Sequence, residues 1–163
     1  MAEVSTPPSN PRTIVLRGNL SERHMEGYAS TTVYPGMLVE KKTTGVEPYG
    51  QWGPHATAGG YAEKVIAVEG YVADIPQAST FNGGTVDDAY ASGDLMMMHH
   101  CEPGDEVWVW LVASGTAVTN ADFLTSNGNG DLKKATSTDQ RLFKVLESVT
   151  PGSSRTRCRA RAL

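Results

Sequence analysis

Residues 106–113 constrain the fold of this chain more than any other stretch. They read Glu-Val-Trp-Val-Trp-Leu-Val-Ala, follow a Pro-Gly-Asp turn at 103–105, and have no helix former in their middle. β-branched and aromatic residues favour strands, and Pro-Gly-Asp is typical of turns. We therefore predict a β-strand here and expect the chain to be organised around a β-sheet.

Both faces of this predicted strand are apolar. Alternation divides the side chains into two sets, Val107, Val109 and Leu111 against Trp108, Trp110 and Val112. A half-exposed antiparallel strand would show polar residues on one face, so each face here needs a cover. The domain's own core covers one face. Either a second layer of the domain or a neighbouring subunit covers the other, and the latter makes Trp108 and Trp110 candidate subunit contacts.

Glycine and proline are spread along the chain and divide it into many short segments. There are 17 Gly and 9 Pro among 163 residues, and no window shows sustained helical spacing of apolar residues. The length and a hydrophobic content of 39% suit one globular domain with a core. We predict an all-β fold of about nine or ten strands.

The predicted strands lie between turns rich in Gly, Pro, Asn and Asp. A polar segment reaches Glu26 without a predicted strand, residues 41–45 read as a polar turn, and residues 49–60 are too irregular for a regular element. The Asn-Gly pairs at 127–130 predict a hairpin. Strands are expected within 13–16, 33–40, 62–68, 71–75, 95–100, 106–113, 121–124, 132–135, 142–149 and 156–163.

The N-terminus is expected to differ from the rest of the chain. We assign residues 1–30 to an extended arm and lead-in strand, and residues 31–163 to the β-domain. Pro7, Pro8 and Pro11 lie among Ser, Thr and Asn, a composition that favours extended polyproline-like conformations. The arm is either a frayed end or a segment that orders against a partner, so these prolines are candidate contacts.

Several functional classes are disfavoured by composition. No apolar stretch has the length of a signal sequence or membrane span, so we expect a soluble protein made in the cytosol without a membrane partner. A net charge of −4 argues against direct nucleic-acid binding. Cys101 and Cys158 are 57 positions apart and form no metal or disulfide pattern, so we expect buried free thiols.

The one candidate metal motif is His99-His100-Cys101. With Gly93 and Glu106 it partly echoes the first metal motif of cupin barrels, but it has a single histidine in ligand spacing and no histidine follows His100. His99 and His100 also alternate faces on a strand. We therefore predict no metal and no cofactor.

No set of catalytic side chains is evident. There is no Gly-x-Ser-x-Gly motif, and the serines lie mostly in turns with no histidine or acid placed to activate them. Asp87 and Asp88 are adjacent and point apart on an extended chain, and no Gly-rich loop precedes a helix. The sequence predicts a protein that is not an enzyme, with no catalytic or cofactor-binding residues.

The C-terminus carries arginines at every second position. Arg155, Arg157, Arg159 and Arg161 fall on one face of a predicted strand, while Thr, Cys and Ala take the other. Like charges in a row repel one another unless acids or solvent lie opposite. The row is either protection of an edge strand against aggregation or an ionic contact, made with an acidic partner or with acids of a neighbouring strand.

Several segments, taken in order, resemble a known family. The carrying segments are IVLRG at 14–18, YPGMLVE at 34–40, HATAGG at 55–60, AEK at 62–64, AVE at 67–69, DAY at 88–90, GD at 93–94, PGDEV at 103–107 and LTSNGNGDL at 124–132. Their joint order is similar to that of the capsid decoration, or cement, proteins of tailed-bacteriophage heads. The arginine-rich tail has no close counterpart in the resemblance.

The resemblance implies a small β-barrel or β-sandwich on the outside of an icosahedral shell. Such proteins sit as homotrimers and clamp adjacent capsomers, so the implied partners are the major capsid protein and neighbouring copies of the chain. Multivalent binding of this kind needs no deep pocket. Two alternatives stay open: a phage tail, fibre or carbohydrate-binding β-module, and a metal-dependent β-barrel enzyme.

Overall fold

The computed structural model describes residues 13–18, 24–42, 50–70 and 86–163, and within these ranges it contains eleven strands and no helix. The strands are β1 (Val15–Arg17), β2 (His24–Ala29), β3 (Val39–Lys42), β4 (Gln51–Pro54), β5 (Val65–Ala67), β6 (Leu95–His100), β7 (Glu106–Leu111), β8 (Phe123–Ser126), β9 (Leu132–Lys134), β10 (Phe143–Val145) and β11 (Thr156–Ala162).

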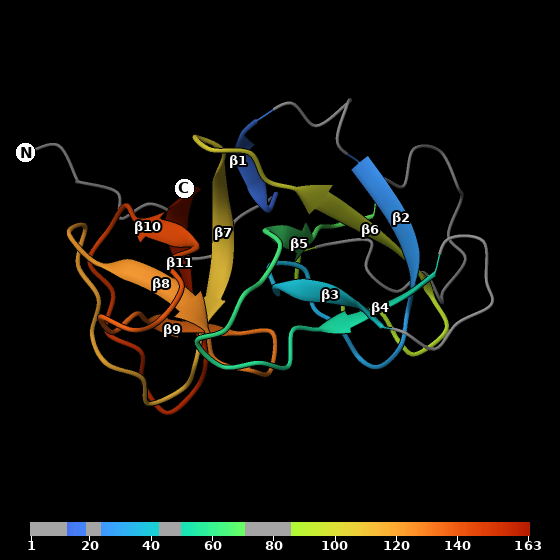
Figure 1. The fold of residues 1–163 in the computed structure, drawn as a ribbon. Coiled ribbons are helices and arrows are strands. Elements are labelled where there is room, and N and C mark those ends of the chain that lie inside the picture. The colour runs from blue at the N-terminus through green and yellow to red at the C-terminus, as the bar shows by residue number, and fades with distance from the viewer. Residues whose placement is uncertain (1–12, 19–23, 43–49, 71–85) are drawn as a thin grey trace, which may run out of the picture.

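Five of the strands close into a small barrel. The order is β7-β11-β10-β8-β9, and the ring closes because β9 pairs with β7 through Leu111 and Leu132. Strand β1 also pairs with β7, at Glu106 and Val107, away from the contact between Leu111 and β9. In Figure 1 the barrel occupies the left half of the molecule. The prediction of an all-β fold containing a small β-barrel is confirmed.

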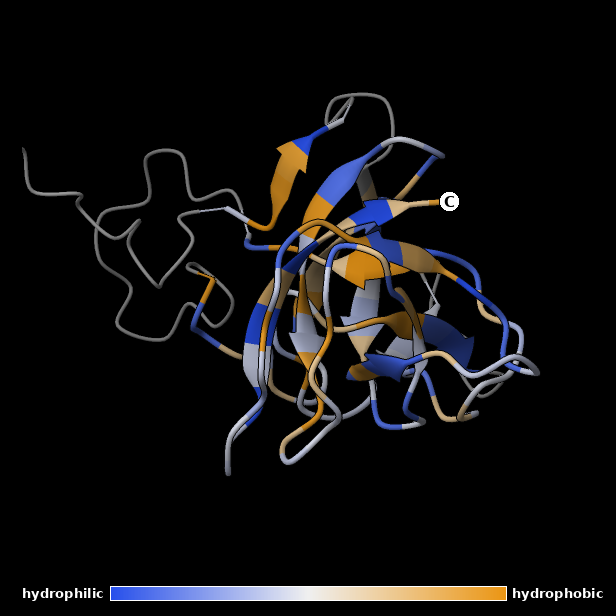
Figure 2. Cartoon of the chain, turned by 90° about the vertical axis from the view of Figure 1, so that its left-hand side faces the viewer, coloured by the Kyte–Doolittle hydropathy of each residue, from blue (hydrophilic) through white to orange (hydrophobic). Residues whose placement is uncertain are grey.

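A second sheet lies beside the barrel, on the right in Figure 1. Its strand order is β3-β4-β2-β6-β5, with β2 in the middle. The two edge strands of this sheet are β3 and β5. An isolated bridge joins Leu38, just before β3, to Ile66 in β5, so this sheet also curves towards closure. Each sheet encloses apolar residues, and Figure 2 shows apolar and hydrophilic segments alternating along the strands, as expected for sheets with one buried face.

The predicted alternation along β7 is confirmed. Val107, Val109 and Leu111 are buried in the barrel core, and Trp108 and Trp110 are half-buried on the barrel's outer face.

The cover of Trp110 comes from the same chain. Its indole Nε1 donates a hydrogen bond of 2.8 Å to the carbonyl oxygen of Pro35, and its backbone N–H donates to Gly36. A side chain at Gly36 would press on the Trp110 ring. On this part of the outer face, therefore, the second layer of the same domain forms the cover.

Two strands were missed from sequence. β2 lies in the segment assigned to the arm and lead-in, and β4 lies in the stretch judged too irregular. The strand β2 reads His-Met-Glu-Gly-Tyr-Ala and has little strand propensity of its own, but it pairs with β4 on one side and β6 on the other. Gly27 leaves room for the Trp52 ring, which a Cβ there would approach to 2.3 Å. Tertiary pairing overrides local propensity here.

Other boundaries also differ from the expectations. The strand expected within 33–40 begins only at Val39 and continues to Lys42, through the start of the predicted polar turn. The hairpin at 127–131 is confirmed: Asn127 N–H donates to the Asp131 carbonyl, and Gly128 and Gly130 have φ of 88° and 84°. Residues 71–75 and the arm prolines Pro7, Pro8 and Pro11 lie outside the described residues.

Candidate functional site

A cluster of linked polar side chains surrounds His55. This residue directly follows β4 and is only 2% exposed. It is held from the barrel side by the β8–β9 turn, because Gly130 N–H donates to the His55 carbonyl and Gly130 accepts a hydrogen bond from Leu38 N–H. A side chain at Gly130 would crowd Pro54 and Met37, so glycine permits this close approach of the two sheets.

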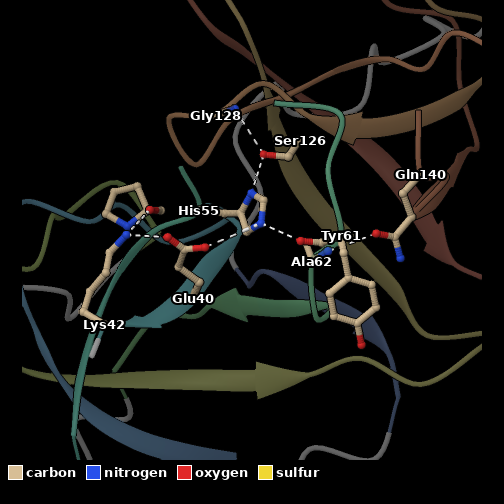
Figure 3. Close-up of polar contacts among 9 residues, drawn as sticks. Glu40, Lys42, His55, Tyr61, Ala62, Ser126, Gly128 and Gln140 are labelled. Atoms are coloured by element: carbon tan, nitrogen blue, oxygen red, sulfur yellow. Dashed lines mark hydrogen bonds and ion pairs between the residues drawn. The ribbon is translucent and has the colours of Figure 1, made fainter. Parts of the chain in front are cut away.

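Both ring nitrogens of His55 have partners (Figure 3). Nδ1 lies 2.7 Å from Ser126 Oγ, and Nε2 lies 3.0 Å from the Tyr61 carbonyl oxygen and 3.5 Å from Glu40 Oε2. A carbonyl oxygen only accepts, so Nε2 carries a proton, and Nδ1 shares a hydrogen bond with the Ser126 hydroxyl. Ser126 Oγ in turn accepts a hydrogen bond of 3.1 Å from Gly128 N–H. The cluster is therefore internally satisfied.

Ser126, His55 and Glu40 have the connectivity of a nucleophile, a base and an orienting acid. No short sequence pattern reveals this grouping, because Glu40 on β3, His55 after β4 and Ser126 on β8 meet only in the fold. Ser126 is 0% exposed, however, so its hydroxyl is closed off from a substrate in this structure. The arrangement joins the barrel to the second sheet.

A pocket of about 240 Å³ opens on the solvent side of this cluster. Burial raises the pKa of Glu40, but the Lys42 ammonium, 2.6 Å away, and His55 outweigh it, so the pKa lies below its ordinary value. Glu40 is thus ionised at neutral pH. The lining residues are Glu40, Lys41, His55, Tyr61, Ala62 and Glu63.

The candidate tryptophans and arginines meet on one surface, the outer face of the barrel. Strand β11 pairs with β7 so that Arg157 lies opposite Trp110, Arg159 opposite Trp108, and Arg161 opposite Glu106. Opposed residues of antiparallel strands point to the same face. The fold therefore brings residues that are about fifty positions apart in the sequence into three cross-strand pairs.

At one end of this face, the arginines contact side chains of the same chain. The Cζ atoms of Arg155 and Arg157 lie 4.3 and 4.1 Å from the centre of the Trp110 ring, and Arg155 also lies 4.0 Å from the Tyr34 ring centre. Arg157 is 8% exposed, pairs with Asp87 at 2.8 Å, and donates to the Val86 carbonyl. These two arginines stabilise the fold through cation–π and ionic contacts.

The other end of the face is exposed and basic. Four successive cross-strand partners lie here, and we call them the basic row. They are Arg17 on β1, Glu106 on β7, Arg161 on β11 and Lys144 on β10. Three spacings between strands make it about 14 Å wide. The hydrogen bond from Arg161, with Arg159 and Arg17 nearby, holds the pKa of Glu106 below its ordinary value. A concavity of about 560 Å³ lies at the β1 end of the basic row. It is lined by Arg17, Gly18, Pro103, Gly104, Asp105 and Arg161.

The two explanations offered for the row of arginines at the C-terminus have different outcomes. β11 lies between β7 and β10, so protection of an edge strand was the wrong explanation of the row. Contact with an acid of a neighbouring strand is confirmed for Arg161, whose guanidinium lies 2.7 Å from Glu106 Oε1. Arg159 and Lys144 are exposed.

The histidine pair does alternate faces. His99 is buried and its Nε2 lies 3.0 Å from Asp105 Oδ2, whereas His100 is exposed. Cys101 and Cys158 are buried thiols that form no disulfide, as predicted. Burial raises the pKa of Cys158 to about 12, so its thiol is protonated at neutral pH. Within the described ranges, no group of three or more potential ligands could hold a metal ion.

Comparison with known proteins gives no family assignment: no protein-family model matches the sequence, and a search of curated proteins finds no match. Across the part of the chain that the structure describes, no helix is long and apolar enough to cross a membrane.

Proposed function

We propose that this chain is a structural virion protein that binds the outer surface of a bacteriophage icosahedral capsid and stabilises contacts between capsomers. The observation that carries the proposal is the ordered set of segments from residue 14 to 132 that resembles the capsid decoration proteins. The implied partners are the major capsid protein and further copies of the chain, as a homotrimer. The implied location is the outside of the capsid.

The outer face of the barrel supplies a contact surface suited to this role. Trp108 is half-buried on this face and Arg159 lies opposite it on β11. The neighbouring basic row adds Arg17, Arg161 and Lys144 together with Glu106, and Glu147 accepts a hydrogen bond from Arg159 N–H. Tryptophan and arginine are enriched at the energetic centres of protein interfaces. The chain as a whole carries a charge of −4, so this basic face would orient it towards an acidic protein surface.

A particle-binding experiment tests the proposal. Purified protein is mixed with phage heads lacking it, and the bound fraction and the heat resistance of the heads are measured after sedimentation. We expect saturable binding and more heat-resistant heads. Arg159→Glu should weaken binding by about tenfold or more, equivalent to about 1.4 kcal/mol, with a smaller effect at high salt.

The matched control is Lys41→Glu, which changes the charge by the same amount on an exposed position of β3. It should bind the heads as the unaltered protein does. Equal loss in both variants would show that only net charge matters, and no binding to heads at all would overturn the proposed function. Binding to isolated tails instead would favour the alternative of a tail or fibre module.

The alternative of a metal-dependent enzyme rests on His99 and His100. Because His99 is engaged with Asp105 and His100 points to the opposite face, a metal would have to break the buried pair. Metal analysis of the native protein separates the alternatives, since stoichiometric zinc or iron would contradict a purely structural role. Substituting both histidines by alanine should leave particle binding within about tenfold.

A further inference from the structure

We propose that the pocket beside His55 binds a neutral saccharide, on the scale of one sugar ring. The pocket lies between β3 and the segment 61–63 and is lined by acidic, basic and aromatic side chains. The inference goes beyond the capsid role and does not depend on it, because it concerns the second sheet and not the outer face of the barrel.

Tyr61 provides an aromatic platform at the pocket. Its side chain is 78% exposed, although its backbone is fixed on both sides. The Tyr61 carbonyl accepts a hydrogen bond from His55 Nε2, and the next N–H, of Ala62, donates to Gln140 Oε1 at 3.0 Å (Figure 3). A single exposed tyrosine is ordinary on a protein surface. Here the backbone hydrogen bonds fix where the Tyr61 side chain leaves the fold, so only its side-chain torsions are restricted when a ligand stacks on its ring.

The charges in the pocket disfavour a charged ligand. A cation would have to compete with the Lys42 ammonium, which already lies 2.6 Å from Glu40 Oε1. An anion would meet the carboxylates of Glu40 and Glu63. A neutral polyhydroxylated ring can instead donate hydrogen bonds to these carboxylates, while its C–H face covers the Tyr61 ring.

The size of the pocket restricts the ligand further. Its volume of about 240 Å³ lies below the range of about 300–1,000 Å³ that is usual for drug-sized ligands. It therefore suits one ring, free or at the end of a chain. With one stacking surface and a few polar contacts, the affinity for a monosaccharide should correspond to a Kd on the order of 1 mM.

Titration of the isolated full-length protein with free sugars tests the proposal. The probes are glucose, galactose, mannose and N-acetylglucosamine, each raised to about 50 mM, well above the expected Kd. The signal is the NMR shift of the backbone amides of Ala62 and Glu63, which the Tyr61 variants retain. At least one sugar should give a saturable shift. Tyr61→Ala should abolish saturation, and Tyr61→Phe should keep it within about threefold, about 0.6 kcal/mol, since the ring is retained.

Two further variants distinguish binding in this pocket from non-specific binding. Glu63→Gln should weaken binding severalfold because it removes a charged acceptor from the pocket. Leu95→Ala, at an exposed apolar residue of β6 outside the pocket, should leave binding unchanged.

Immobilised polymers of the same sugars distinguish the terminus of a polysaccharide from a free sugar as the ligand, and retention that depends on Tyr61 would support the former. The proposal is wrong if no sugar gives saturable binding, or if Tyr61→Ala binds a sugar as the unaltered protein does. It is also wrong if saturable binding is seen only with a lysine-rich peptide. None of these outcomes bears on binding to phage heads, which is measured separately.

Discussion

The Nδ1 atom of His55 lies 2.7 Å from the Oγ atom of Ser126, and this contact joins the two halves of the fold. His55 follows β4 of the second sheet, and Ser126 ends β8 of the barrel. Both side chains are buried, so neither has water as an alternative partner. Such a hydrogen bond stabilises the relative position of the two sheets because each group is costly to leave unpaired.

Removing either partner should therefore destabilise the protein. We expect His55→Ala and Ser126→Ala each to lower the free energy of unfolding by about 1–3 kcal/mol, measured by denaturant titration. The double variant should lose less than the sum, because one contact is shared. His100→Ala, at an exposed position, is the control and should change stability by no more than about 0.5 kcal/mol. Strict additivity would contradict the coupling.

Trp110 should contribute strongly to stability. Its ring contacts Arg155 and Arg157, and its indole N–H donates to Pro35. Trp110→Ala should lower the free energy of unfolding by about 3 kcal/mol, through lost packing and a cavity. Trp110→Phe keeps a ring but loses the hydrogen bond and should cost less. A folded Trp110→Ala variant with unchanged unfolding and sedimentation would refute both this role and a subunit contact.

Tyr90 should make the protein less stable at alkaline pH. Its hydroxyl donates to the Val68 carbonyl at 2.7 Å, and burial raises its pKa from 10.0 to about 12. The folded state thus keeps the proton that the unfolded state releases, so stability falls as pH rises from about 10 to 12. In this window Tyr90→Phe should show a flatter decline than the unaltered protein. Tyr61→Phe, at an exposed position, should show the same decline as the unaltered protein.

Deletion of residues 1–11 tests the proposed arm. The expected result is unchanged thermal unfolding of the isolated protein together with weaker retention on phage heads after dilution or heating. The physical reason is that three prolines restrict the free chain, so less entropy is lost on docking. Competition between truncated and full-length protein for the same heads is the measurement, and equal retention would mean that the arm is a frayed end.

The sequence by itself determined the all-β class and the elements with strong local signals. The alternation along β7 and the hairpin around Gly128 and Gly130 were predicted from nearby residues. The first depends on a period of two and the second on a turn that requires positive φ. Such signals are local, so a single sequence carries them. The burial of Cys101 and Cys158 was predicted from their spacing, which fits no metal or disulfide pattern.

Only the tertiary structure decided how the chemistry-bearing residues are grouped. The strand β2 has weak propensity and forms because β4 and β6 pair with it. His55, Ser126 and Glu40 come from three separate strands or their ends, and their meeting depends on the turn at Gly130 docking against the second sheet. The four arginines look equivalent in sequence, yet the β7–β11 register places Arg157 against Trp110 and leaves Arg159 exposed. Pairing partners and register are long-range properties, and they depend on contacts that no short stretch of sequence contains.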